Sequence, residues 1–113
     1  MHGFSIEDLP YIKGWGHSTA PMLMSTKMEK SHGGGYVFPL TRKAITDAYR
    51  RANISGPADL DAIETHDCFS ITEYMAIEHF GITRPGEAWK AIEEEKETAI
   101  CNLSSAENFL TKL

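Results

Sequence analysis

Several features that would each mark a class of protein are missing from this sequence. It holds only two cysteines, Cys68 and Cys101, which are too few for a disulfide framework and too far apart for a C-x-x-C redox pair. A reducing compartment, the cytoplasm, is therefore expected. No apolar run approaches the roughly 18 residues of a membrane span. The N-terminus has no positively charged region followed by an apolar stretch, so a secretory signal is not expected.

Basic residues are also scarce and scattered. The chain has 11 Lys and Arg against 16 Asp and Glu, which gives a formal net charge of −5. Without a basic run or patch, nucleic acid is not an expected partner. The last three residues, Thr111-Lys112-Leu113, weakly resemble the peroxisomal S-K-L signal and leave a peroxisomal location open as an alternative. The composition is otherwise that of one ordinary globular domain.

The clearest predicted element is a helix over residues 39–53. Pro39 suits the first turn of a helix, where its missing N–H is not needed, and Asn53 precedes a Ser-Gly-Pro stop. Apolar residues recur at three- and four-residue spacing, which places them on one face. These residues are Leu40, Ala44, Ile45, Ala48, Tyr49 and Ala52.

Other elements are predicted on both sides of this helix. We expect strands over residues 11–16 and 60–65, helices over 68–80 and 86–96, and a long loop over 18–35 with one helical turn. A final helix is favoured in the tail, residues 98–113. The order strand, helix, strand, helix predicts an α/β fold with parallel strands and crossover helices. The core is expected to include Trp15 and Trp89, and the methionines between positions 22 and 28.

The chemistry concentrates in residues 64–69, which read ETHDCF between a predicted strand and a predicted helix. Ligands of open α/β sheets bind at the carboxyl ends of strands. A helix that begins near Cys68 would favour the thiolate, and His66 could hold a proton or a developing oxyanion. One cysteine beside one histidine is, however, as often packing as catalysis. A metal site made of His66, Cys68 and His79 fits no standard zinc spacing, so no metal is expected.

A string of motifs resembles a known family. Residues 60–73, LDAIETHDCFSITE, resemble the segment of sterol-carrier-protein type thiolases that holds their H-D-C-F motif. Residues 57–61 resemble the P-x-D-[IL]-D turn before it, and residues 78–81 and 86–91 resemble segments after it. The matches come in the family's order and cover roughly residues 5–96.

The resemblance implies that residues 1–96 are part of the C-terminal domain of an acetyl-CoA acetyltransferase-like thiolase, followed by a divergent tail over 97–113. Thiolases form or cleave carbon–carbon bonds between acyl groups carried on coenzyme A. A coenzyme A thioester is thus the implied substrate, with no covalently bound cofactor. By the same resemblance Cys68 is the acid/base, His66 an oxyanion donor, Phe69 a residue near the pocket, and Asp67 a support of the loop.

Two departures from the family pattern limit this expectation. The family's acylated cysteine lies in an N-terminal domain that has no counterpart here, and its G-H-P segment should follow residue 96, where the chain reads ETAICNLSS. We therefore expect a fragment or subunit that is incomplete alone and works with the missing thiolase half or self-associates. Whether the chain is itself an enzyme stays open. The alternative is a truncated, non-catalytic thiolase-like binding or interaction module.

Overall fold

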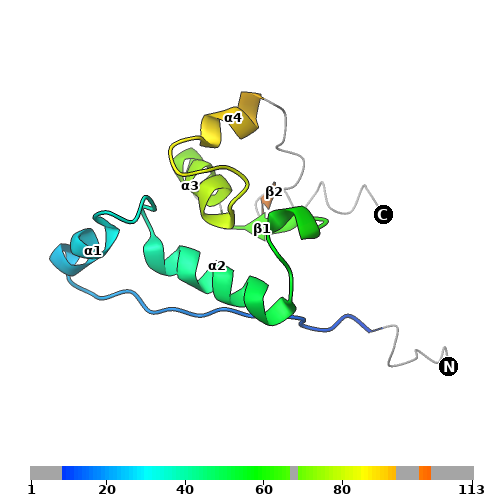
Figure 1. Cartoon of the computed structure of the whole chain (residues 1–113). Helices are drawn as coiled ribbons and strands as arrows, with labels where there is room; N and C mark the ends of the chain where they lie inside the picture. The colour runs from blue at the N-terminus through cyan, green and yellow to red at the C-terminus, as the bar shows by residue number, and fades with distance from the viewer. Residues whose placement is uncertain (1–8, 67–68, 94–99, 103–113) are drawn as a thin grey trace.

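The computed structural model describes residues 9–66, 69–93 and 100–102, and these residues are mainly helical. The elements are α1 (Met24–Ser31), α2 (Pro39–Ala52), the 3₁₀ turn η2 (Pro57–Asp59), β1 (Ile63–Thr65), α3 (Ser70–Phe80), α4 (Ala88–Glu93) and β2 (Ile100–Asn102). Helices α3 and α4 lie on one side of α2, and an extended N-terminal segment runs along its other side (Figure 1). Among the described residues, no helix has the length and apolarity to cross a bilayer.

Helix α2 begins at Pro39, as its sequence predicts, and ends at Ala52, one residue before the predicted bound. Asn53 follows as its C-cap in the left-handed conformation with φ 56°. The N–H of Asn53 donates to the carbonyl of Arg50, and the N–H of Ile54 donates to that of Tyr49. These two bonds satisfy carbonyls that the helix end would otherwise leave unpaired.

The apolar stripe of α2 serves two neighbours at once. Its alanines carry the extended segment: a Cβ placed on Gly14 would lie 2.5 Å from the carbonyl oxygen of Ala48, and one on Gly16 would lie 1.7 Å from that of Ala44. Ile45 and Tyr49 of the stripe lie toward α3 instead: Ile45 lines a hollow shared with α3, and the hydroxyl of Tyr49 donates to the carbonyl of Phe80. The small alanines therefore allow the extended segment to lie close to α2, whereas larger side chains form the contact between α2 and α3.

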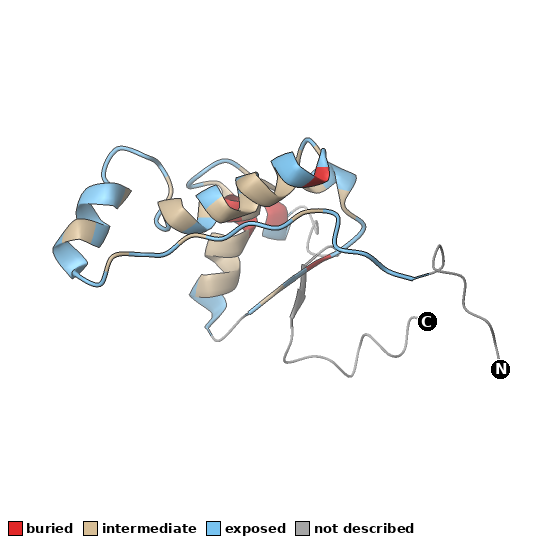
Figure 2. Cartoon of the chain, turned by 90° about the horizontal axis from the view of Figure 1, so that it is seen from below, coloured by how far each residue is buried: buried red, intermediate tan, exposed pale blue. Residues whose placement is uncertain are grey.

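The core forms where α3 meets α4. Ile77, Ala88 and Ala91 are buried there, and Tyr74 and Ile82 pack against them. Figure 2 shows how few of the described residues are buried, and α1 contains none of them. Helix α3 ends at Gly81, whose φ of 86° suits glycine. Three successive residues of the last turn of α3 are buried, so the chain surrounds this end of the helix.

Helix α4 is only six residues long and is held by side chains of α3. The carboxylate of Glu78 accepts hydrogen bonds from the N–H groups of Gly86 (2.8 Å) and Ala88 (3.4 Å). The hydroxyl of Tyr74 accepts a bond from the N–H of Trp89 at 3.2 Å. Helices this short are marginal alone. The start of α4 therefore depends on α3, which supplies acceptors for its unpaired N–H groups.

The strands differ from the prediction. β1 and β2 pair in parallel, with Ile63 opposite Ile100 and Thr65 opposite Asn102. The segment 11–16 is extended but is not a strand, because it packs on a helix and pairs with no strand among the described residues. Residues 100–102, within the stretch where we expected a final helix, form β2. A parallel pair is thus present, whereas the larger α/β sheet stays a prediction.

Our predictions for the tryptophans and methionines were wrong. Trp15 is 61% exposed and Trp89 is 46% exposed. Each indole is covered by a cation, since the guanidinium of Arg51 lies 3.8 Å from the ring centre of Trp15 and Lys90 lies 5.6 Å from that of Trp89. Met24 and Met28 are exposed too. They line an open groove of about 670 Å³ between α1 and the start of α2 rather than a core.

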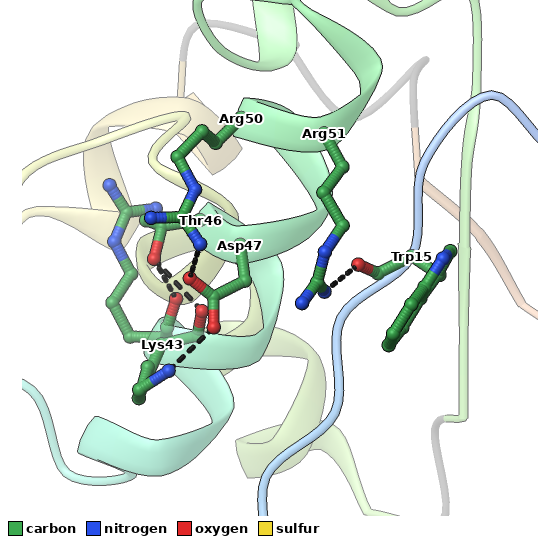
Figure 3. A network of polar contacts seen from close by, with 7 residues as sticks. Trp15, Lys43, Thr46, Asp47, Arg50 and Arg51 are labelled. Carbon is green, nitrogen blue, oxygen red and sulfur yellow. Dashed lines mark hydrogen bonds and ion pairs between the residues drawn. The ribbon is translucent and has the colours of Figure 1, made fainter.

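Figure 3 shows the polar network on the exposed side of α2. Asp47 accepts hydrogen bonds from Lys43 (2.5 Å) and Arg50 (3.0 Å). Arg51 reaches the other way and donates to the carbonyl of Trp15, so it ties the extended segment to α2. The hydrogen bond from Lys43, assisted by the nearby positive charges, lowers the pKa of Asp47 from its ordinary value of 3.8.

This lowered pKa predicts a pH-dependent contribution to stability. Because the folded-state pKa is below the unfolded one, the stabilisation is present above pH 3.8 and is lost as the pH falls through the folded value. Asp47→Asn should therefore lower the urea midpoint at pH 7, with the gap to the unchanged chain closing as the pH is lowered below 3.8. A gap that is constant from pH 7 to pH 2 would contradict the assignment.

The close contact of the extended segment with α2 predicts that Gly16→Ala destabilises the chain. The added methyl cannot fit against the carbonyl of Ala44, and overpacking of this kind costs about 1–3 kcal/mol. Gly34→Ala is the matched control, since a Cβ there meets nothing within 4 Å. Chemical unfolding of both variants tests this, and an equal effect at the two positions would be the contrary result.

Candidate functional site

The residues predicted to carry chemistry follow directly after β1. His66 comes next after Thr65, the last residue of this parallel strand, and α3 begins at Ser70. Ile63, the first residue of the strand, is buried. The predicted motif thus occupies a four-residue connection from the carboxyl end of a strand to the N-terminus of a helix, which is where α/β proteins place ligands.

The structure describes the two ends of this connection. His66 is exposed, and so is Phe69, whose side chain is 70% exposed. Phe69 is the N-cap of α3, and its carbonyl accepts the N–H of Thr72 at 2.7 Å. Asp67 and Cys68 lie outside the described residues. The helix begins two residues later than predicted, so Cys68 precedes the N-cap by one position.

The N-terminus of α3 carries a partial positive charge that favours an anionic group nearby. The first N–H groups of a helix have no partner within it, and they carry a partial positive charge. Phe69 makes no side-chain cap bond, and its carbonyl accepts the N–H of Thr72. Glu73 lies in the first turn and is the acidic residue that offsets part of this charge.

A hollow of about 410 Å³ lies beside this connection. Its walls are α2, the end of β1 and α3, and they are mostly apolar. The residues that line it are Phe38, Thr41, Ile45, Thr65, Thr72, Met75, Ala76, His79 and Phe80. Thr72, Ala76 and Phe80 of α3 line this hollow together with residues of α2, whereas Phe69 precedes the helix and is exposed.

His79 forms the deepest polar contact in this region. It is only 2% exposed. Its Nε2 accepts the N–H of Phe38 at 2.9 Å, and its Nδ1 lies 2.6 Å from the carbonyl oxygen of Met75. An Nε2 that accepts an N–H carries no proton, so Nδ1–H is the donor to Met75. The ring also contacts the aromatic rings of Tyr36 and Phe38.

Sequence reasoning missed the buried polar residues Glu78 and His79. In the sequence, Glu78 belongs only to a family-like segment and His79 only to a metal set that fits no zinc spacing. Periodicity predicts that polar residues of a helix face solvent, so it gives no indication that these two are buried. The signal that could have found them is the turn after Gly81, which needs a partner for its N–H groups. In the part of the chain that the structure describes, no three His, Cys, Asp or Glu side chains gather as a metal site would require.

Comparison with known proteins identifies the family. The model of the family described as "Thiolase C-terminal domain-like" matches residues 24–104, well over half of the chain. The chain belongs to this thiolase C-terminal domain-like family. The match includes the connection after β1 as well as helices α1 to α4 and β2. The resemblance that the sequence motifs indicated is thereby confirmed.

Individual relatives agree with this membership. Sterol carrier protein 2 of Gallus gallus is 34% identical over 61 residues, which are 54% of this chain and 11% of that protein. Acetyl-CoA acetyltransferase of Methanothermobacter thermautotrophicus is 39% identical over 54 residues, or 48% and 14% of the two chains. The enzyme of the same name from Methanocaldococcus jannaschii is 43% identical over 53 residues, or 47% and 13%. This thiolase-family chain thus spans about an eighth of each relative's length.

The two bonds of His79 predict a large effect of His79→Phe. Phenylalanine keeps a ring in the same place but leaves the N–H of Phe38 unpaired where the chain is partly buried, which costs about 1–3 kcal/mol. His32→Phe is the matched control, because His32 is exposed and its ring bonds only the carbonyl of Met28 at 3.3 Å. Unfolding free energies measure both changes. A loss no greater at position 79 than at position 32 would show that the bonds do not hold the fold.

Proposed function

We propose that this chain carries the acid/base part of a thiolase-type active site that acts on acyl-CoA thioesters. The observation that carries the proposal is the family match over residues 24–104, which includes the connection that reads HDCF. In this proposal Cys68 is the acid/base, His66 donates to the oxyanion, Asp67 supports the loop, and Phe69 borders the substrate. The acylated cysteine comes from another part of the thiolase assembly.

The proposed reaction balances as a carbon–carbon bond formation. The Cys68 thiolate removes a proton from the carbon next to the thioester carbonyl of one acyl-CoA. His66 stabilises the oxygen of the resulting enolate, whose carbon attacks the acyl group on the nucleophilic cysteine. The carbon–sulfur bond of that acyl-enzyme breaks, and the departing thiolate takes the proton from Cys68. In the reverse direction the carbon–carbon bond breaks and leaves the acyl group on the nucleophilic cysteine; the thiol of coenzyme A then attacks that acyl group and releases the cysteine, which completes thiolysis.

Two features of the structure support this assignment. The motif stands between the carboxyl end of β1 and the N-terminus of α3, where the positive end of the helix dipole favours a thiolate. The adjoining hollow has apolar walls, which suits the acyl part of a thioester rather than its charged end. Exposure of His66 and Phe69 also leaves both side chains accessible to a substrate or to a partner domain.

The chain alone should not turn over acetoacetyl-CoA and coenzyme A, because nucleophile, base and oxyanion donors act as a unit. Activity is expected when residues 24–96 replace the matching segment of an acetyl-CoA acetyltransferase, whose own G-H-P segment then follows. In that chimera Cys68→Ala should lower kcat by about 100-fold or more, with thermal unfolding unchanged. Thr46→Ala, on the exposed side of α2, is the control and should keep most of the activity.

The outcomes separate this proposal from its alternative. A folded chimera that is inactive with Cys68 in place would contradict the acid/base role and favour a non-catalytic, thiolase-like binding or interaction module. Turnover by the purified chain alone that Cys68→Ala abolishes would show instead that no further thiolase half is needed.

A further inference from the structure

A second, polar pocket lies beyond the C-terminal end of α3, and it shares no lining residue with the hollow described above. It measures about 410 Å³, which is within the range of small-ligand sites. Its walls come from the start of α2, the turn after α3 and helix α4. The residues that line it are Tyr36, Arg42, Gly81, Ile82, Thr83, Arg84, Pro85, Glu87, Lys90 and Ala91. None of them belongs to the connection after β1.

The charge of this pocket is opposite to that of the chain. Arg42, Arg84 and Lys90 line it together with a single carboxylate, that of Glu87, whereas the whole sequence has a formal charge of −5. Lys90 donates to Glu87 at 2.7 Å, and this bond lowers the pKa of Glu87. One cation is thereby neutralised. Among the described residues neither Arg42 nor Arg84 forms an ion pair, although the charge of Arg84 also lowers the pKa of Glu87.

Arg42 is held in place before any ligand arrives. Its Nη1 donates to the carbonyl of His79 at 2.7 Å, and its guanidinium lies 5.2 Å from the ring centre of Tyr36. A Cβ on Gly81 would lie 3.1 Å from the same Nη1, so glycine there leaves room for the guanidinium. A guanidinium fixed in this way loses little freedom on binding, and its remaining donors suit the oxygens of an anion.

Arg84 and Thr83 complete the set of donors. The side chain of Arg84 makes no hydrogen bond or ion pair with the described residues. The hydroxyl oxygen of Thr83 is buried and has no hydrogen-bond partner among them. A buried hydroxyl without a partner lowers stability. Thr83 lines the pocket, and a change of χ1 to another staggered rotamer is the movement by which its hydroxyl could reach and donate to a ligand there.

We propose that this pocket binds a phosphate group, supplied as inorganic phosphate or as the phosphate monoester of a larger ligand. Two guanidinium groups offer paired N–H donors that match the spacing of phosphate oxygens, and the Thr83 hydroxyl adds a third donor. Glu87 opposes the anion, and its ion pair with Lys90 limits that repulsion. The proposal rests on these residues alone and does not depend on the thiolase function proposed above.

Calorimetric titration of the full chain at low ionic strength tests the proposal. The three probes are inorganic phosphate, coenzyme A and 3′-dephospho-coenzyme A. Arg84→Gln should weaken binding about tenfold, because a bond to a charged group is lost. Glu87→Gln should tighten it about threefold by removing the repelling charge. Arg50→Gln is the matched control, since Arg50 lies outside the pocket, pairs with Asp47 and should change binding less than about twofold.

Thr83→Val provides a readout that a purely structural role would not give. Replacing a buried, unpartnered hydroxyl by a methyl should keep or raise the unfolding midpoint. The same change should weaken phosphate binding about threefold, since one neutral hydrogen bond is lost. A stable variant with unchanged affinity would remove Thr83 from the site.

Each result decides between the sources of the phosphate or against the site. Binding of inorganic phosphate that depends on Arg84 identifies a free anion as the ligand. Binding of coenzyme A that is lost in its 3′-dephospho form and in Arg84→Gln identifies a phosphate monoester. The proposal is overturned if no probe binds, or if Arg84→Gln and Arg50→Gln act equally. Coenzyme A binding that is indifferent to Arg84 also overturns it, while leaving the thiolase proposal intact.

Discussion

The imidazole of His79 sets the geometry on which both candidate sites depend. Through Nε2 it holds the residue that precedes α2, and through Nδ1 it holds the preceding turn of α3. Its own carbonyl fixes the guanidinium of Arg42. One buried side chain thus joins α2 to α3: it lines the apolar hollow beside β1 itself, and through its carbonyl it holds Arg42 of the polar pocket.

A core this small explains why polar contacts have such importance here. The buried apolar residues of the described ranges include three alanines but only two larger side chains, Ile63 and Ile77. Burial of so little apolar surface contributes modestly to stability. The carboxylate of Glu78 and the ring of His79 then do what larger apolar residues do elsewhere, because each bonds two backbone groups and joins segments distant in sequence.

The local elements could be read from the sequence, but their contacts could not. The spacing of apolar residues and the stop at Asn53 predicted α2, and Gly81 marked the end of α3. Residues 11–16 have the composition of a strand, yet Gly14 and Gly16 allow them to lie on the alanines of α2 instead. That choice depends on a partner surface more than 25 residues away, which no local pattern records.

The same distinction applies to the sites. The position of His66 after a strand followed from the order of elements, and the chemistry of Cys68 came from resemblance to thiolases rather than from spacing. The polar pocket had no signal at all in the sequence. Arg42 belongs to α2, Arg84 to the turn after α3 and Lys90 to α4, so only the fold brings these cations to one place.

The two glycines of the extended segment have a consequence for evolution. They occupy a stretch that is largely exposed. Exposed connecting segments usually vary in sequence between relatives. Yet any side chain at Gly14 or Gly16 would collide with the backbone of α2, and backbone atoms cannot be exchanged for smaller ones. Selection at these two positions therefore acts through shape alone, and no compensating substitution on α2 can relieve it.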